Sequence, residues 1–395
     1  MNKILKKSIS FFFTMSLIFS AGSSFSQELT KEDKALLLSD IGQKQIVALG
    51  DATHTDYTAS KLRVDLIKEL VEKYHFSIIG IESNLFEVYK AFEDFKANGN
   101  IAEMSESLYY AVRNNELDKL FFYIKKQNEK GNNIKVFGFD SDFSGENSYK
   151  TFIEGIQKNL IDAEMECKDI SFEEFSGHLE KIVPTNLKAL LRTKKDYRIV
   201  YDYLTCYLNN NPISDNNEIL NKSLSNLQTL IYSKSKGRNR DITRDSIMFS
   251  NIVYLKNKYP NEKMILFGSS THFQRDLKAS NSKFAQKTGW INLGERLSNK
   301  FHNDYFFIAY TEISGNTRGF HGKKQKLKEL IPNSIEKMVD EKYDANIEIM
   351  YLSNNRDKVM FENADYTRIM GNTFLEMDIS KTVDGLFFIR NSNLD

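Results

Sequence analysis

Two histidines end the same short pattern, in which an apolar stretch is followed by Gly-x-x-Thr-His. The first copy runs from Gly50 to His54 and the second from Gly268 to His272. Imidazole titrates near neutral pH, so a histidine that follows a strand can exchange a proton with a substrate or a water. Two copies of one pattern predict two related halves that face a shared cleft. Spacing alone leaves an alternative open, in which the glycine makes a tight turn, the threonine caps a helix and the histidine is incidental.

Three carboxylates stand beside these histidines at the ends of apolar stretches. Asp51 lies inside the first pattern, and Glu82 and Asp140 directly follow the next two stretches along the chain. If the stretches are parallel strands, their carboxyl ends meet at one edge of a sheet, which is where ligands bind in open α/β folds. The sequence therefore predicts a single rim that carries both histidines and all three carboxylates.

Two arginines stand at positions where a helix is expected to be apolar. Arg63 has helical spacing with Ile67 and Leu70, and Arg244 has helical spacing with Met248. A guanidinium group on an inward face needs a carboxylate or a bound anion, because burying it unpaired is costly. We expect the rim carboxylates to be the partners. The alternative is that both arginines form purely structural ion pairs beneath the sheet.

The elements that position these residues follow an α/β pattern. Strand-like runs alternate with helical periodicity, which predicts a central, mostly parallel sheet flanked by helices. From residue 145 to residue 237 the strand pattern stops, and we expect a helical insertion or cap over the sheet. The predicted strands are Gln45–Leu49, Ser77–Ile81, Ile134–Phe139, Met264–Phe267, Tyr305–Tyr310 and Gly385–Arg390.

The N-terminus has the pattern of a signal peptide over residues 1–26, with cleavage expected after Ser26. Lysines at the start precede an apolar run from Ile9 to Ala21 and then small residues. We therefore expect a periplasmic or secreted protein with one α/β domain over residues 27–395 and no membrane partner after cleavage. The 54 basic and 53 acidic residues nearly cancel, which argues against nucleic acid as a partner.

Cys167 and Cys206 are the only cysteines, and both fall in the predicted helical segment. Export permits a disulfide between them. Their spacing is unlike that of a metal site, and two buried thiols remain the alternative.

The motifs together resemble the erythromycin esterase family, in order and in spacing, over nearly all of the chain beyond residue 26. The resemblance rests on six elements: Gly50 to His54 with Arg63 nine residues on; Glu82 after the next strand; Gly138 to Asp140; Arg244, Asp245, Met248 and Asn251; Phe267 to His272; and Val383 to Phe388.

The resemblance implies hydrolysis of a small-molecule ester or lactone by an activated water. His54 would be the general base, with Glu82 on the same water and Arg63 paired with Glu82 or Asp51. His272 or Arg244 would stabilise the oxyanion. No serine stands in a Gly-x-Ser-x-Gly elbow, so no serine nucleophile is expected. The remaining substrate-binding candidates are Asp140, Ser269 and Ser270.

The chain departs from the family pattern at three positions. Asp51 replaces a glutamate, and Ser269 and Ser270 replace the histidine and asparagine of a His-Asn-x-His segment. If the missing imidazole held the substrate carbonyl or completed a proton relay, its loss would slow or abolish the family's reaction, by about 10²–10³-fold for one such group. The alternative is therefore a non-catalytic small-molecule-binding relative.

A third hypothesis is a metal-dependent hydrolase. The two histidines with Asp51, Glu82 and Asp140 offer nitrogen and oxygen ligands suited to Zn²⁺ or Mn²⁺, but no pair has tight metal-site spacing. We expect no cofactor. The family name suggests a macrolide substrate and antibiotic resistance, but the sequence of the predicted cap contains no specificity motif that identifies the substrate.

Overall fold

The computed structural model describes residues 29–54, 56–163, 167, 169–182, 192–211, 217–281, 283–318, 323–392 and 394. The predicted signal peptide and its cleavage site lie outside these residues. Within them, no helix is both long enough and apolar enough to span a bilayer.

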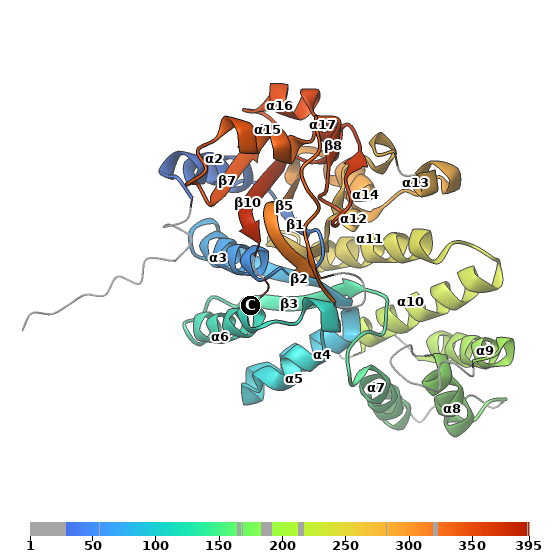
Figure 1. The fold of residues 1–395 in the computed structure, drawn as a ribbon. Helices are drawn as coiled ribbons and strands as arrows, with labels where there is room; N and C mark the ends of the chain where they lie inside the picture. The colour runs from blue at the N-terminus through green and yellow to red at the C-terminus, as the bar shows by residue number, and fades with distance from the viewer. Residues whose placement is uncertain are drawn as a thin grey trace, which may run out of the picture.

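In the described residues the central sheet has the strand order β3-β2-β4-β1-β5-β10-β7, with β6 paired to β5 (Figure 1). All neighbours from β3 to β10 are parallel, whereas β7 and β6 are antiparallel to their partners. The strands are β1 Ile46–Asp51, β2 Phe76–Asn84, β3 Lys135–Asp140, β4 Lys263–Ser269, β5 Tyr305–Arg318, β6 Lys324–Lys326, β7 Ile349–Ser353 and β10 Gly385–Ser392. A separate pair consists of β8 Tyr366–Thr367 and β9 Leu375–Glu376.

The α/β prediction is confirmed, and each of the six predicted strands overlaps an observed strand. The strand β7 was not predicted, because a run of four apolar residues, Ile349 to Leu352, cannot be distinguished from a buried helical turn by its periodicity.

Alternating residues of each strand build two cores, one on each face of the sheet. In β1, Ile46 and Ala48 join one core, whereas Val47 and Leu49 join the other. The strands are buried on both faces, as expected for parallel strands between two helical layers.

Helices cover both faces of the sheet and close these cores. The core that includes Val47 and Leu49 is covered by α2 Lys31–Ile41, α3 Tyr57–Tyr74, α5 Ile101–Glu106 and α6 Asn115–Glu129. The opposite core is covered by α11 Arg240–Lys258, α14 Leu293–Phe301, α15 Ile335–Lys342, α16 Lys358–Asn363 and α17 Ile379–Thr382. The remaining short elements are η1 Tyr110–Val112, α12 Ser270–Phe273, η3 Leu277–Ala279, α13 Lys283–Thr288 and η4 His302–Asp304.

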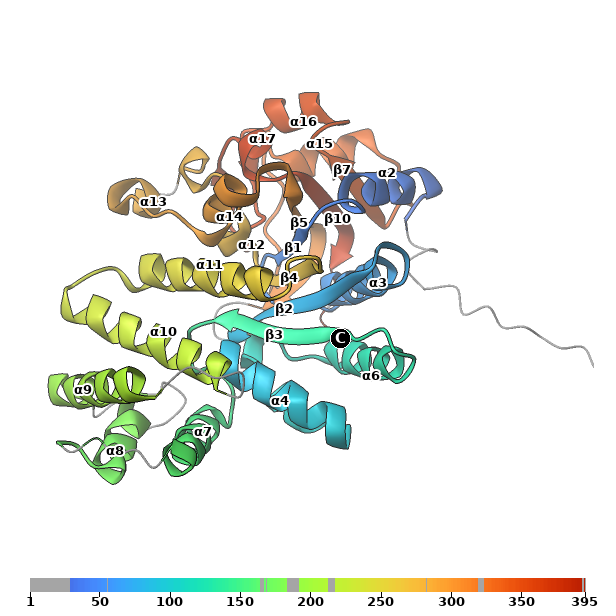
Figure 2. The ribbon, with the colours of Figure 1, turned by 180° about the vertical axis from the view of Figure 1, so that it is seen from behind.

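The segment between β3 and α11 is helical in its described residues, as predicted. It contains α7 Ser148–Ala163, α8 Phe172–Ile182, α9 Lys194–Asn210 and α10 Glu218–Ser235. Figures 1 and 2 show these helices stacked beyond α4 Leu85–Asn98, on the β3 side of the sheet.

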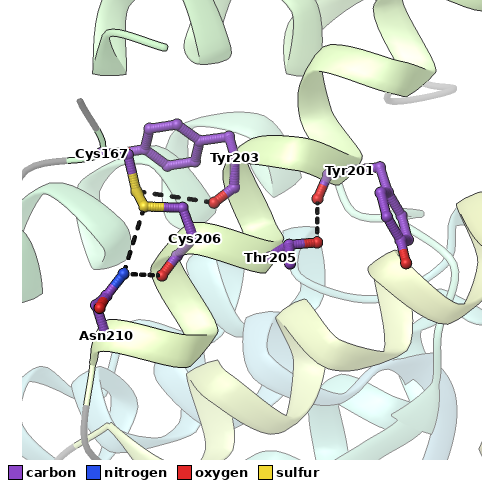
Figure 3. Close-up of a disulfide and its surroundings, with 6 residues drawn as sticks. All are labelled: Cys167, Tyr201, Tyr203, Thr205, Cys206 and Asn210. Atoms are coloured by element: carbon purple, nitrogen blue, oxygen red, sulfur yellow. Dashed lines mark hydrogen bonds between the residues drawn. A yellow bond between two sulfur atoms is a disulfide. The ribbon is translucent and has the colours of Figure 1, made fainter. Parts of the chain in front are cut away.

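A disulfide joins Cys167 to Cys206 inside this helical segment (Figure 3). It links the chain just before α8 to the C-terminal part of α9, where Asn210 Nδ2 donates to Cys206 O at 2.9 Å. Of the two alternatives that the sequence left open, the structure has the disulfide.

Candidate active site

The carboxyl ends of β1 to β4 open into a cavity of about 1500 Å³, called the main cavity below. His54, Glu82, Asp140, Arg244, Ser269 and His272 all line it. No described residue between 145 and 237 lines it, so the described part of the helical segment does not cap the cleft as expected. The reason is that α7 to α10 pack against α4 and one another, with α10 also against α11, on the β3 side of the sheet.

The two Gly-x-x-Thr-His elements lie side by side, because β1 and β4 pair in register. Gly50 is opposite Gly268, and Asp51 is opposite Ser269. A Cβ atom on Gly50 would stand 2.8 Å from Ser270 Cα, and one on Gly268 would stand 2.4 Å from Glu82 Oε2. Both glycines are therefore needed for close approach of neighbouring groups, and not only for a turn.

His54 is held from behind by an aspartate and an arginine. Its Nδ1 lies 2.8 Å from Asp51 Oδ1, and Arg63 Nη1 donates to Asp51 Oδ2 at 2.6 Å. The backbone at His54 is left-handed, with φ of 60°, and its amide donates to Asp51 Oδ1 at 3.1 Å. Arg63 thus pairs with Asp51 rather than Glu82, and neither Arg63 nor Asp51 lines the main cavity.

These charges oppose the effect of burial on the pKa values of Asp51 and His54. Burial favours the neutral carboxyl, but the charges of His54 and Arg63 outweigh it and lower the pKa of Asp51. Burial likewise disfavours the imidazolium, but Asp51 and then Glu82 outweigh it and raise the pKa of His54. Asp51 therefore stays ionised and fixes the ring of His54, which leaves Nε2 directed away from Asp51.

Glu82 connects the two elements. Its Oε2 accepts from Ser269 N at 2.7 Å and lies 3.9 Å from His54 Nε2. Its Oε1 accepts from Arg244 Nη2 at 2.8 Å and lies 3.4 Å from His272 Nε2. Burial alone would raise the pKa of Glu82, but the charges of His272, Arg244 and His54 hold it well below its ordinary value.

Arg244 donates hydrogen bonds to two of the rim carboxylates, Asp140 and Glu82. Its Nε donates to Asp140 Oδ1 at 3.0 Å, and its Nη2 bridges Asp140 Oδ2 at 2.5 Å and Glu82. Burial opposes its charge, but Asp140, Glu82 and Asp142 raise the pKa of Arg244 well above its ordinary value. The predicted pairing of Arg244 with rim carboxylates is confirmed.

His272 forms a second buried dyad, with Asp245. His272 Nδ1 lies 2.6 Å from Asp245 Oδ1, and Trp290 Nε1 donates to Asp245 Oδ2 at 2.6 Å. Burial disfavours the charged ring, and Arg244 Nη1 at 3.0 Å from Nε2 opposes its charge as well. Asp245 and Glu82 outweigh both effects and raise the pKa of His272 to about 10. The raised pKa favours the charged ring of His272 over a neutral base at neutral pH.

The raised pKa of His272 predicts a specific pH dependence of stability. Because its folded pKa exceeds the ordinary 6.5, the stabilisation is complete below pH 6.5 and is lost as pH rises through 10. His272→Asn should remove this component, which is on the order of several kcal/mol at about 1.4 kcal/mol per pKa unit. Urea unfolding of both proteins from pH 6 to 10.5 measures it; parallel curves for the two proteins would contradict a charged His272.

The two serines have different surroundings. Ser269 lines the main cavity, and its Oγ accepts from Thr271 N at 3.3 Å as the N-cap of α12. Ser270 is fully buried beside Gly50 and does not line the cavity. The prediction that Ser270 binds substrate is therefore wrong, because its side chain points into the packing between β1 and β4.

The spacing patterns of the sequence predict no role for Asp245, Trp290 or Tyr109. Asp245 directly follows Arg244 in the helical motif named above, and an acid next to an inward-facing arginine was the signal that could have identified it. Tyr109 lies between α5 and α6, and its ring meets that of His54 edge-on at 6.2 Å. No spacing pattern relates it to a strand end.

The donor set does not favour a resident metal. Across the described ranges, no three His, Cys, Asp or Glu side chains are arranged to hold an ion. The carboxylate oxygens that would be metal ligands instead accept hydrogen bonds from guanidinium groups. Asp51 accepts from Arg63, and both Asp140 and Glu82 accept from Arg244.

Comparisons with known proteins agree with this architecture. A family model described as erythromycin esterase matches residues 71–392. The match starts after His54 and Arg63, so for these residues the resemblance rests on the motif. The Bacillus subtilis (strain 168) protein YbfO, whose name assigns it provisionally to the hydrolases, is 22% identical over 321 residues, covering 72% of this chain and 69% of YbfO.

Three solved structures have similar folds. A mutant of the erythromycin esterase EreC, in its open conformation, has a TM-score of 0.66 at 16% identity and covers 93% of this chain and 96% of its own. A Bacillus cereus protein has a TM-score of 0.65 at 18% identity, with 91% and 92% covered. A succinoglycan biosynthesis protein has a TM-score of 0.65 at 15% identity, with 91% of each chain covered. At these identities the likeness establishes the fold alone.

Proposed function

Because the chain belongs to the erythromycin esterase family of hydrolases, we propose that it cleaves a small-molecule ester or lactone with a water activated by His54. The observation that carries the proposal is the arrangement of His54 and Glu82. His54 Nδ1 is held by Asp51, while Nε2 faces Glu82 Oε2 across 3.9 Å. This gap is too long for a direct hydrogen bond, so one water can contact both acceptors.

The reaction proceeds by addition and elimination. Neutral His54 takes a proton from the water at Nε2 while the water oxygen bonds to the carbonyl carbon, and the carbonyl π electrons move to its oxygen. The imidazolium that forms is stabilised by ionised Asp51 and Glu82. When the oxyanion collapses, the ester C–O bond breaks and the leaving oxygen takes the proton from His54 Nε2. The products are a carboxylic acid and an alcohol, and no cofactor is required.

The cationic side chains beside Glu82 and Asp51 have a supporting role in the proposed reaction. Arg244 and His272 hold Glu82 ionised and in place, and Arg63 does the same for Asp51. Preorganised charges of this kind avoid the cost of reorganising solvent during the reaction. Incubating residues 27–395 with esters and lactones tests the proposal, because hydrolysis of at least one is expected.

We further propose that the protein is exported and acts on a small molecule outside the cytoplasm. The signal-peptide pattern of residues 1–26 supports export. The disulfide between Cys167 and Cys206 supports it independently, since such bonds persist mainly in oxidising compartments. The main cavity, at about 1500 Å³, has room for a substrate as large as a macrocyclic lactone.

One observation favours a second candidate, a binding protein without catalysis. Ser269 lines the cavity at the position where the family pattern has a histidine, and its hydroxyl is used to cap α12. Such a protein would retain a ligand in the main cavity without turning it over.

Ser269→His separates the two candidates. If the wild type is already an enzyme, we expect the variant to change kcat/KM by no more than about tenfold, because His54 and Glu82 are in place without it. Loss of the N-cap should cost about 1 kcal/mol of stability, and Ser269→Asn keeps a cap without imidazole as the matched control. Hydrolysis by Ser269→His alone, with none by the wild type or Ser269→Asn, would support the binding protein.

A further inference from the structure

Several donors beside the proposed oxyanion are already engaged by other groups. Arg244 uses Nε and Nη2 on Asp140 and Glu82, and its Nη1 contacts His272. His272 lies between Asp245 and Glu82. The amide of Ser269 donates to Glu82. A further donor on the cavity wall would therefore strengthen the stabilisation of the charge that develops on the carbonyl oxygen.

Tyr109 is held beside both groups that would activate the water. Its amide donates to Ser83 Oγ at 2.9 Å, and Ser83 directly follows Glu82 and donates in turn to Glu82 O at 2.8 Å. Its ring meets the ring of His54 edge-on, with 6.2 Å between centroids and an interplanar angle of 88°. Tyr109 is half-buried and lines the main cavity.

The hydroxyl of Tyr109 has the protonation state of a donor. Burial raises the pKa of Tyr109, and a hydrogen bond with the side chain of Tyr110 and the charge of Glu82 raise it further, so the phenol stays protonated at all physiological pH values. A neutral hydroxyl can donate to an oxyanion without bringing another charge into the cluster.

The other tyrosines that line the cavity are placed differently. Tyr57 already donates its hydroxyl to Glu116 Oε1 at 2.8 Å. Tyr110 packs its ring against Tyr109 at 4.7 Å but is 66% exposed, at the solvent side of the pair. Of the three tyrosines among the described residues that line the main cavity, Tyr109 is thus the one whose ring contacts the ring of His54.

We propose that Tyr109 is a catalytic residue, whose hydroxyl donates a hydrogen bond to the oxyanion formed when the His54-activated water adds to the carbonyl; this rests on the proposed hydrolase function. The O–H bond of Tyr109 stays intact throughout, because the proton of the water goes to His54 and from there to the leaving oxygen.

The test compares Tyr109→Phe with Tyr232→Phe, which removes one hydroxyl from an exposed tyrosine of α10 outside the main cavity. On any substrate that the wild type hydrolyses, Tyr109→Phe should lower kcat by about 10²-fold with KM changed less than about threefold. The pH dependence of kcat should keep its shape, because His54 remains the base. Tyr232→Phe should leave kcat within about threefold of the wild type, and near-UV circular dichroism checks that both variants are folded.

The outcomes are distinguishable. A wild-type kcat for Tyr109→Phe, a decrease equal to that of Tyr232→Phe, or an effect confined to KM would overturn the role of Tyr109 while leaving the hydrolase function intact. Absence of turnover by the wild type itself would overturn the proposed function and this inference together.

Discussion

His54→Asn is expected to lower kcat/KM by about 10²–10⁴-fold, the usual contribution of a general base. The reason is that His54 is the imidazole whose Nδ1 is held by Asp51 and whose other nitrogen faces Glu82 in the main cavity. Asparagine tolerates the left-handed backbone at this position, where φ is 60°, so the substitution removes the base with little backbone strain. Steady-state kinetics on a hydrolysed ester or lactone measure the change.

His302→Asn is the matched control. His302 also has a positive φ, of 48°, and it is exposed and outside the main cavity. The same exchange there should leave kcat/KM within about twofold of the wild type. Equal losses in the two variants would mean that His54 has no special part in the chemistry.

Glu82→Gln is expected to be the most damaging conservative substitution in both activity and stability. It keeps the shape of the side chain but removes the charge that pairs with Arg244 and that raises the pKa of His54 and of His272. Leaving a buried charge with one partner fewer costs about 3–5 kcal/mol. Since Glu82 also faces the activated water, kcat should fall by at least about 10²-fold. Urea unfolding and steady-state kinetics measure the two effects.

Glu262→Gln is a control for removing one carboxylate charge from a partly buried ion pair. Glu262 pairs with Lys135 Nζ at 2.7 Å near the starts of β3 and β4, at the end of the sheet opposite to the main cavity. Its side chain is 27% exposed, so its loss should cost about 0–1 kcal/mol and leave kcat unchanged. A smaller loss of stability in Glu82→Gln than in Glu262→Gln would contradict the structural role of Glu82.

Much of the site could be predicted because parallel strands bring distant residues together by a simple rule. His54, Glu82, Asp140 and His272 each follow an apolar strand, and the carboxyl ends of such strands meet at one edge. The buried arginines were recognisable for a related reason, since a charge on an apolar helix face requires a partner.

The remaining features depend on loop paths and on packing, which periodicity does not encode. The sequence left Arg63 with two candidate partners, because it fixes the face of α3 but not the distance to Asp51 or Glu82. Tyr109 reaches the site from the chain between α5 and α6, without a motif. The helical segment was predicted as helical, but a helical period does not say which neighbour its apolar face will meet.

The disulfide illustrates the same limit. Cys167 and Cys206 are separated by 39 positions, and only the docking of α9 beside residue 167 brings them together. Composition and export made the bond chemically reasonable, but a sequence contains no distance between two side chains.

The central claim is that this chain hydrolyses an ester or a lactone, and turnover by the purified protein tests it most directly. Residues 27–395 with the disulfide formed would be incubated with a panel from simple aryl esters to macrocyclic lactones, and acid release followed by mass spectrometry. We predict release from at least one substrate, at a rate that His54→Asn abolishes and His302→Asn does not. Binding of panel members in the main cavity without release of acid from any of them would contradict the claim.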